Sequence, residues 1–214
     1  MITHLSEIVK TYAEELLSRQ EIKVMVDKLK ENNPAVVEDV VPNVVSYSYL
    51  QRILCMLLKE GIPIRDLATI LETLGDYQAT LKDVDVTCEY VRQALKRTIT
   101  RKYADGGQIR VFTLDAQIEN MIISAVKKTD QGSYLALEPD TIQKIVSAFN
   151  QEADKVKDVI PSTIVLTSPI VRVYFKKLID QFIPHVNVLS FNEIDSSVQI
   201  QSIGNISLNE YNYN

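Results

Sequence analysis

The sequence contains few of the residues on which metal centres and redox sites depend. Among its 214 residues are only two cysteines and two histidines. Cys55 and Cys88 lie far apart in the sequence, without the close spacing of a metal site or a redox pair. We therefore interpret both as small apolar residues, in a chain that suits a reducing compartment.

The sequence also lacks a long apolar run and a secretory leader. No window approaches the roughly 18–20 apolar residues that a membrane-spanning helix needs. Hydrophobic residues make up 46% of the chain and charged residues 24%, which is ordinary for a soluble globular protein. The net charge of −5 argues against broad binding to nucleic acid or anionic membranes, because neutralising phosphates requires excess positive charge.

Motifs that would hold a nucleotide or activate a nucleophile are missing. Neither G-x-G-x-x-G nor G-K-[ST] occurs, and Ser168 does not lie in a G-x-S-x-G elbow. Only His4 and His185 could serve as a base, and neither has a metal partner at ligand spacing. Asp83 and Asp85 precede a helix and fit caps better than calcium ligands. The sequence therefore predicts no enzyme active site, no cofactor and no metal.

The N-terminal half is predicted to be all-helical, from Thr3 to Lys102. Leu5–Leu17 follows the i, i+3, i+4 apolar pattern, and Ser18 with Glu21 forms a capping box that starts the next helix. Gly61 separates two apolar helices as a C-terminal stop. A single long helix is predicted over residues 86–102.

Gly106-Gly107 marks a change to alternating strands and helices. Residues 109–114 predict a strand, and residues 163–194 predict a strand, a helix capped by Ser168 and a further strand over 186–191. A last strand is predicted over residues 198–206. Because such crossovers are right-handed and join parallel strands, the fold class is α+β and multidomain: a helical region, then a small α/β domain with a mostly parallel sheet. The apolar positions of the helix after Ser168 are Ile170, Val173, Tyr174, Leu178 and Phe182.

The helix pair around Gly61 has the appearance of a helix-turn-helix. A DNA-reading second helix needs polar and basic groups at its start, whereas here Arg65 is accompanied by Asp66 and Glu72. This charge balance favours a packing unit, and a helix-turn-helix regulator with an α/β sensor domain remains the alternative hypothesis. A hydrolase that uses Ser168 is a third.

The helix over residues 86–102 carries the basic stripe of the chain. Such a stripe is either a solvated face, with cations favourable at a helix C-terminus, or a surface that meets an acidic partner or subunit. Together with Arg65 and Asp66, we predict Arg92 and Lys96 as candidate subunit contacts. The stripe comprises Arg92, Lys96, Arg97, Arg101 and Lys102.

Six segments in a fixed order resemble the FHIPEP family of flagellar and virulence type III secretion export-gate proteins, and particularly its flagellar branch. Six ordered segments that cover nearly the whole chain are more specific than any one motif. The segments are THLSEIVKTYAEELLSRQE, DVVPNVVSYSYLQRILCMLLKEGIPIRDLATILETLGDY, CEYVRQALKRTI, YLALEPD, SPIVRVYFKKLIDQFIP and VNVLSFNEI.

The resemblance implies three parts: residues 1–20 ending the family's first cytoplasmic subdomain, residues 21–103 as its helical subdomain, and residues 104–214 as its α/β subdomain. The family's membrane domain, most of its first and all of its second cytoplasmic subdomain would be missing. The full-length protein would be embedded in the bacterial inner membrane, with this part on the cytoplasmic face.

The resemblance also implies a non-enzymatic role. Family members form a nine-membered ring, bind flagellar export chaperones with their substrates and other export components, and help order secretion. Their chaperone groove lies mainly between the first and second subdomains, so that only Thr3 matches a position at its border. No nucleic-acid partner is expected.

Overall fold

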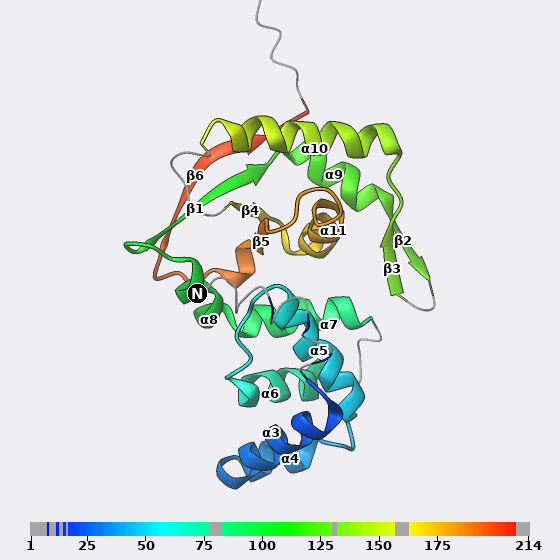
Figure 1. Ribbon diagram of the computed structural model, residues 1–214, viewed down its shortest axis with the longest axis vertical. Helices are drawn as coiled ribbons and strands as arrows, with labels where there is room; N and C mark the ends of the chain where they lie inside the picture. Colours follow the sequence, from blue (N-terminus) through cyan, green and yellow to red (C-terminus); the bar gives the residue numbers. More distant parts are fainter. Residues whose placement is uncertain are drawn as a thin grey trace, which may run out of the picture. The chain divides into compact units, whose positions relative to one another are not determined.

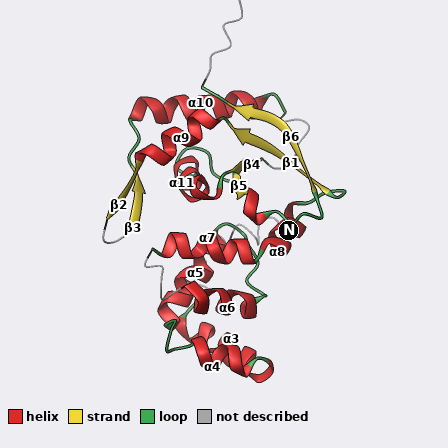
Figure 2. Cartoon of the chain, turned by 180° about the vertical axis from the view of Figure 1, so that it is seen from behind, coloured by secondary structure: helices red, strands yellow, loops and turns green. Residues whose placement is uncertain are grey.

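The computed structural model describes residues 8, 12, 15, 17–77, 83–129, 132–156 and 163–208. The chain divides into a helical unit, Met1–Ile99, and an α/β unit, Thr100–Asn214 (Figure 1, Figure 2). This confirms the predicted fold class, while the family boundaries at residues 20 and 103 stay predictions. The predicted first helix falls largely outside the described residues. None of the described helices has the length and apolar character needed to cross a membrane.

The helical unit begins, in its described part, with the predicted capping box. Glu21 N–H donates to Ser18 Oγ at 3.3 Å, and Ser18 N–H donates to Glu21 Oε2 at 2.7 Å. Two orphan donors at the start of α3 are thereby satisfied. The helices are α3 (Arg19–Asn32), α4 (Pro34–Val40), α5 (Tyr47–Lys59), α6 (Leu67–Tyr77), α7 (Val84–Ala94) and α8 (Lys96–Tyr103), of which α8 crosses the boundary between the units.

The turn after α5 is a Schellman motif. Gly61 has a φ of 69°, its N–H donates to Leu58 O, and the N–H of Ile62 donates to Leu57 O, both at 2.8 Å. Glycine adopts this left-handed conformation without the steric cost of a Cβ. Ile62 is fully buried beyond the turn. The predicted stop at Gly61 is therefore confirmed, although α6 begins only at Leu67.

The prediction of one helix over residues 86–102 is wrong, because the chain bends at Leu95. This residue has a ψ of 14°, far from the helical value of about −42°. Hydrogen bonds continue on both sides, from Leu95 N–H to Val91 O and from Ile99 N–H to Leu95 O, each at 3.0 Å. Since the i, i+4 bonds persist, the apolar spacing persists too, and the sequence pattern carries no sign of the bend.

The prediction that Arg92 belongs to an exposed stripe is also wrong. Its side chain is 1% exposed, and Nη1 lies 3.1 Å from Glu60 Oε2. A buried guanidinium requires a carboxylate partner, and Glu60, at the C-cap of α5, supplies one. The pair joins the end of α5 to the last turn of α7.

The α/β unit contains a four-stranded sheet in the order β5-β4-β1-β6, with every pairing parallel. Figure 1 shows β1 and β6 running side by side beneath α10. The predicted parallel sheet is confirmed. Its elements are β1 (Gln108–Leu114), α9 (Ala116–Ala125), β2 (Val126–Thr129), β3 (Gly132–Leu135), α10 (Pro139–Asp154), β4 (Ile164–Thr167), α11 (Pro169–Ile179), β5 (Asn187–Ser190), the 3-10 helix η1 (Phe191–Glu193) and β6 (Gln199–Ile206).

Helices α9, α10 and α11 pack their apolar side chains against the sheet. The burial pattern of β1 shows why the sheet is covered: Val111, Phe112 and Leu114 are all buried, so successive residues are enclosed. Strands of parallel sheets are commonly buried on both faces. The principal core comprises Phe112, Leu114, Ile118, Ile122, Ile145, Phe149, Val165, Val171, Phe175, Leu178, Ile179, Val186, Val188 and Ile206.

Two details of the strand-helix-strand segment differ from the prediction. Ile170 and Phe182, predicted on the apolar face, are 66% and 49% exposed. Val171 and Phe175 are buried instead, so the inward face of α11 is rotated relative to the predicted one. The helix also ends at Ile179, before Phe182. The β2–β3 hairpin and η1 were not predicted, since strands of four residues and a single 3-10 turn leave little periodic signal.

Arg172 is the second buried arginine of the described chain. It is 1% exposed, its Nη1 donates to Val188 O at 3.3 Å, and its Nε lies 4.0 Å from Glu193 Oε1. Glu193 is fully buried and its Oε2 accepts from Ser190 N–H at 2.7 Å. This network joins α11, β5 and η1.

We expect Gly61→Ala to destabilise the helical unit by about 1–2 kcal/mol, because alanine pays a steric penalty at positive φ. Urea unfolding followed by circular dichroism measures the change. Gly61→Asn is the matched control and should cost less, since asparagine tolerates the left-handed region. Equal midpoints for Gly61→Ala and the wild type would show that the turn does not need glycine.

We expect Arg92→Met to lower the free energy of unfolding by about 3 kcal/mol, because the substitution removes the cation facing the half-buried Glu60. Arg52→Met, at an exposed position of α5, is the control and should change stability by less than about 0.5 kcal/mol. Adding Glu60→Leu to Arg92→Met should recover part of the loss. Equal effects of Arg92→Met and Arg52→Met would contradict a stabilising pair.

Candidate functional site

The start of α6 presents two of the predicted contact residues to solvent. Arg65 and Asp66 are both exposed. Asp66 also caps the helix, because its Oδ1 accepts from Thr69 N–H at 3.2 Å and its Oδ2 accepts from Thr69 Oγ1 at 2.9 Å. Asp66 therefore has a structural role, and its predicted role in a subunit contact is untested.

The exposed surface of α6 is acidic rather than basic. Its exposed positions are Glu72, Asp76 and Tyr77. Two carboxylates would repel a phosphate backbone, and DNA-reading helices place basic and polar groups at this position. The geometry therefore gives no support to the helix-turn-helix alternative.

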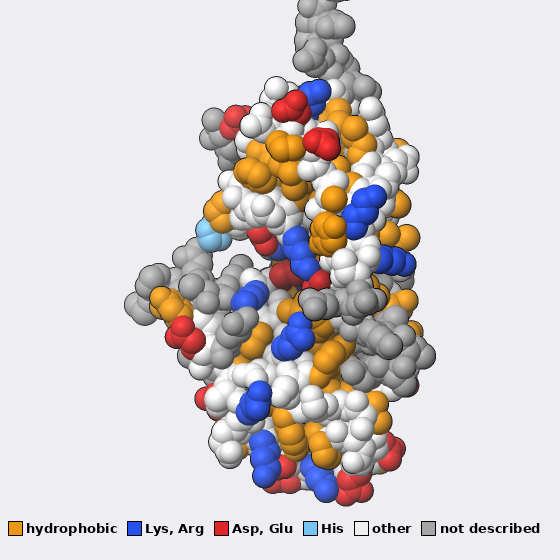
Figure 3. Space-filling model, turned by 90° about the vertical axis from the view of Figure 1, so that its right-hand side faces the viewer, with side chains coloured by type: hydrophobic (Ala, Val, Ile, Leu, Met, Phe, Trp, Pro, Cys, Tyr) orange, Lys and Arg blue, Asp and Glu red, His pale blue; other side chains and the backbone are white. Residues whose placement is uncertain are grey.

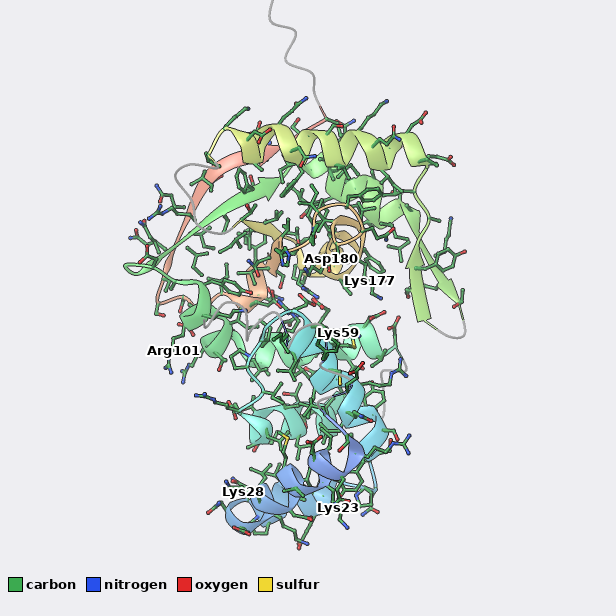
Figure 4. All side chains as sticks on the ribbon, in the orientation of Figure 1. Lys23, Lys28, Lys59, Arg101, Lys177 and Asp180 are labelled. Carbon is green, nitrogen blue, oxygen red and sulfur yellow. The ribbon has the colours of Figure 1, made fainter. Side chains whose placement is uncertain are left out.

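Helix α8 carries four cations, which we name the α8 cationic surface: Lys96, Arg97, Arg101 and Lys102. All four side chains are exposed, and α8 contains no acidic residue. Arg101 extends outward from the ribbon in Figure 4. By contrast, the end of the helical unit formed by α3 and α4 mixes Lys and Arg with Asp and Glu (Figure 3). The α8 cationic surface thus consists of four exposed cations and does not include the buried Arg92.

The carboxyl end of β4 does not form the anion site or nucleophile that its sequence could suggest. Ser168 is the N-cap of α11, as predicted, but its side chain makes no capping bond. Glu119 Oε1 of α9 instead accepts from Ser168 N–H at 2.7 Å, so a carboxylate already occupies the helix N-terminus. The Oγ of Ser168 is buried and has no hydrogen-bond partner among the described residues, which does not fit an accessible nucleophile activated by a base.

Two further polar candidates lie at a helix cap and in an exposed turn. Asp83 is the N-cap of α7 and accepts from Asp85 N–H at 2.9 Å, as predicted. His185 is exposed in the turn before β5, with a φ of 75°. Within the part of the chain that the structure describes, no group of three or more His, Cys, Asp or Glu could hold a metal ion.

A long groove runs between α9 and α10 of the α/β unit. Its two adjoining parts measure about 760 Å³ and 980 Å³ and share Gln117, Met121 and Thr141. One part has a mainly apolar floor that includes Leu137, while the other is more polar. The sequence analysis missed this groove, because its walls come from elements whose distance apart is set by tertiary packing. Thr3 lies outside the described residues.

The curated relatives of this chain include flagellar biosynthesis proteins. It is 42% identical over 207 residues to "Flagellar biosynthesis protein FlhA" of Bacillus subtilis (strain 168), covering 96% of this chain and 31% of the relative. It is 31% identical over 206 residues to "Low calcium response locus protein D" of Yersinia pestis, covering 96% and 29%. The chain thus spans less than a third of the length of these curated relatives.

Solved structures show the same fold. The Chlamydia pneumoniae CdsV protein matches with a TM-score of 0.85 and 36% identity, over 96% of this chain and 59% of that one. The nonameric EscV cytosolic domain of a type III secretion system matches with a TM-score of 0.78 and 31% identity, over 96% and 60%.

The family resemblance seen in the six ordered segments is confirmed by these matches. The sequence profile of the FHIPEP family matches residues 1–199, which is most of the chain. A family-wide match of this extent, together with a 42% identical relative, establishes membership. This chain belongs to the FHIPEP family.

Proposed function

We propose that this chain is the cytoplasmic docking and ring-forming part of a flagellar type III protein export gate. The observation that carries the proposal is its similarity to a nonameric cytosolic domain, combined with exposed surfaces of opposite sign. The function is one of binding and assembly rather than catalysis. The full-length protein would lie in the inner membrane, with this part on its cytoplasmic face.

A closed ring places particular demands on the surface of its subunit. In a head-to-tail ring each copy must offer two different surfaces that complement each other. This chain carries the α8 cationic surface and, on α6, the exposed carboxylates of Glu72 and Asp76. We propose that these two surfaces meet between neighbouring copies, with Arg65, Asp66 and Lys96 among the contact residues. Arg92 is excluded as a contact, because it is buried against Glu60.

The proposed partners of the assembled ring are flagellar export chaperones with their substrates and other export components. A structure of the related Chlamydia pneumoniae CdsV in complex with CdsO matches this chain with a TM-score of 0.84. By analogy, we propose that this chain takes part in complexes with further apparatus components and helps order secretion. Since the chaperone groove would lie mainly in segments outside this chain, only Thr3 would border it.

We expect the double variant Lys96→Glu, Arg101→Glu to weaken self-association, because it reverses two of the four charges of the α8 cationic surface. Sedimentation velocity across a concentration series measures the assembly, which should also weaken as salt screens the charges. Lys144→Glu with Lys127→Glu, two exposed lysines of the α/β unit, is the matched control and should assemble as the wild type does.

A charge swap identifies the opposing surface. Glu72→Lys with Asp76→Lys should fail to assemble, and adding Lys96→Glu and Arg101→Glu to the same chain should restore assembly, because every interface then again joins opposite charges; Asp66 is left intact because it caps α6. A fourfold variant that stays monomeric while the wild type assembles would rule out this pairing of surfaces. A wild type that stays monomeric at its highest soluble concentration would contradict ring formation by this chain alone.

We expect the longer cytoplasmic part of the full protein to bind a substrate-loaded flagellar chaperone, and this chain alone to bind about tenfold or more weakly, because it would lack most of the groove. Isothermal titration calorimetry measures both. In the longer protein Thr3→Arg should weaken binding, whereas Asn150→Arg, at an exposed position of α10, is the control. Absence of binding by the longer protein would refute the docking function.

A further inference from the structure

The outer edge of β6 offers unpaired backbone groups. β6 pairs with β1 on one side, and within the described residues no strand pairs with its other side. Gln199 N–H donates to Gly107 O at 3.0 Å, so Gln199, which precedes the register shift of this strand pair, faces β1. Because successive residues of a strand direct their polar groups to opposite sides, Ile200 and Ser202 face the open edge.

This edge has almost none of the features that keep edge strands from pairing. Natural edges are protected by lysines, prolines, bulges or a covering element. Residues 198–208 contain no charged residue and no proline. Residues 199–202 are all exposed, and the one interruption is a register shift opposite Val111 and Phe112. The first half of β6 is therefore an open, uncharged pairing edge.

The apolar layer of the sheet is also unfinished at this edge. Ile200 pairs in register with Ile109, so both side chains lie on the same face. Ile109 is fully buried, whereas Ile200 is 44% exposed. An added strand would cover Ile200 with its own side chains while its backbone satisfied the groups of Ile200 and Ser202.

We propose that the outer edge of β6 binds an extended, uncharged segment of another polypeptide, which adds a fifth strand to the sheet. Strand addition draws its affinity from main-chain hydrogen bonds and its specificity from alternate side chains. The absence of charge on β6 selects for a segment of alternating polar and apolar residues. This surface belongs to the α/β unit and does not depend on the proposed ring contacts or on a chaperone groove.

A second copy of β6 fits the edge less well than a separate segment. Pairing of two identical edges would be isologous and would produce a two-fold dimer. The related cytosolic domains are nonameric, and an odd-numbered ring has no place for such a pair at every subunit. The free segment of another chain is therefore the occupant that we propose.

The test uses a fluorescein-labelled peptide of alternating threonine and valine with a lysine at each end. We expect saturable binding by fluorescence anisotropy, and slower amide hydrogen exchange at Ile200, Ser202 and Asn205 by NMR when the peptide is added. A peptide in which each threonine is replaced by proline is the matched control and should not bind, because it lacks the donors for a ladder. Equal binding of the two peptides overturns the proposal.

Ser202→Pro removes one outward backbone N–H donor. This should weaken peptide binding about tenfold, which is the effect expected for the loss of one hydrogen bond. Ser202→Thr keeps the donor and should bind as the wild type does. Thermal unfolding checks that the variants fold, and if Ser202→Pro does not, Ile200→Lys is the deciding variant, since it places a charge at the edge. Unchanged affinity in the folded variant overturns the proposal.

Two further outcomes would also overturn strand addition. Exchange protection confined to the groove between α9 and α10 would place the peptide there instead. A wild-type dimer that Ser202→Pro dissolves, without peptide binding, would make a second copy the occupant. Loss of ring assembly in the α8 variants has no bearing on peptide binding at β6. The proposed ring contacts and the proposed strand addition are therefore tested separately.

Discussion

Within each unit, the folded arrangement depends on one physical constraint, the burial of an arginine. A guanidinium is always charged, and its removal from water is tolerated only where a carboxylate and hydrogen-bond acceptors surround it. Arg92 meets Glu60 in the helical unit, and Arg172 meets Glu193 and Val188 O in the α/β unit. In each unit the pair joins elements that are separate in the sequence.

The same constraint decides which charges remain for binding. Because Arg92 is buried inside the helical unit, the exposed members of the predicted basic stripe are those of α8, beyond the bend at Leu95. At the carboxyl edge of the sheet, Glu119 takes the N-terminus of α11 and the Ser168 hydroxyl is buried. Places where many α/β folds bind ligands are thus filled by the protein's own groups. What remains on the described surface is charge on helices, the α9–α10 groove and an open strand edge, all of which suit protein partners.

Local signals in the sequence were sufficient for most of the elements. The Ser18–Glu21 capping box, the Gly61 stop and the strand-helix-strand order after residue 163 all depend on neighbours within a few positions, and the structure confirms them. The phase of α11 could not be read in this way. Both Ile170 and Val171 are apolar, and only contact with the sheet decides that Val171 turns inward.

The sequence by itself determined the fold class and the parallel character of the sheet, because these follow from the order and spacing of apolar segments. It also determined the family, because six ordered segments resemble it. Tertiary structure alone decided that Arg92 is internal, that Glu119 caps α11 and that, among the described residues, no strand pairs with the outer edge of β6. The physical reason is that each of these depends on a partner distant in sequence: 32 residues separate Arg92 from Glu60, and 49 separate Ser168 from Glu119. The pairing of charges, the exposure of side chains and the pairing of strand edges are properties of the folded arrangement. The type of residue does not specify them.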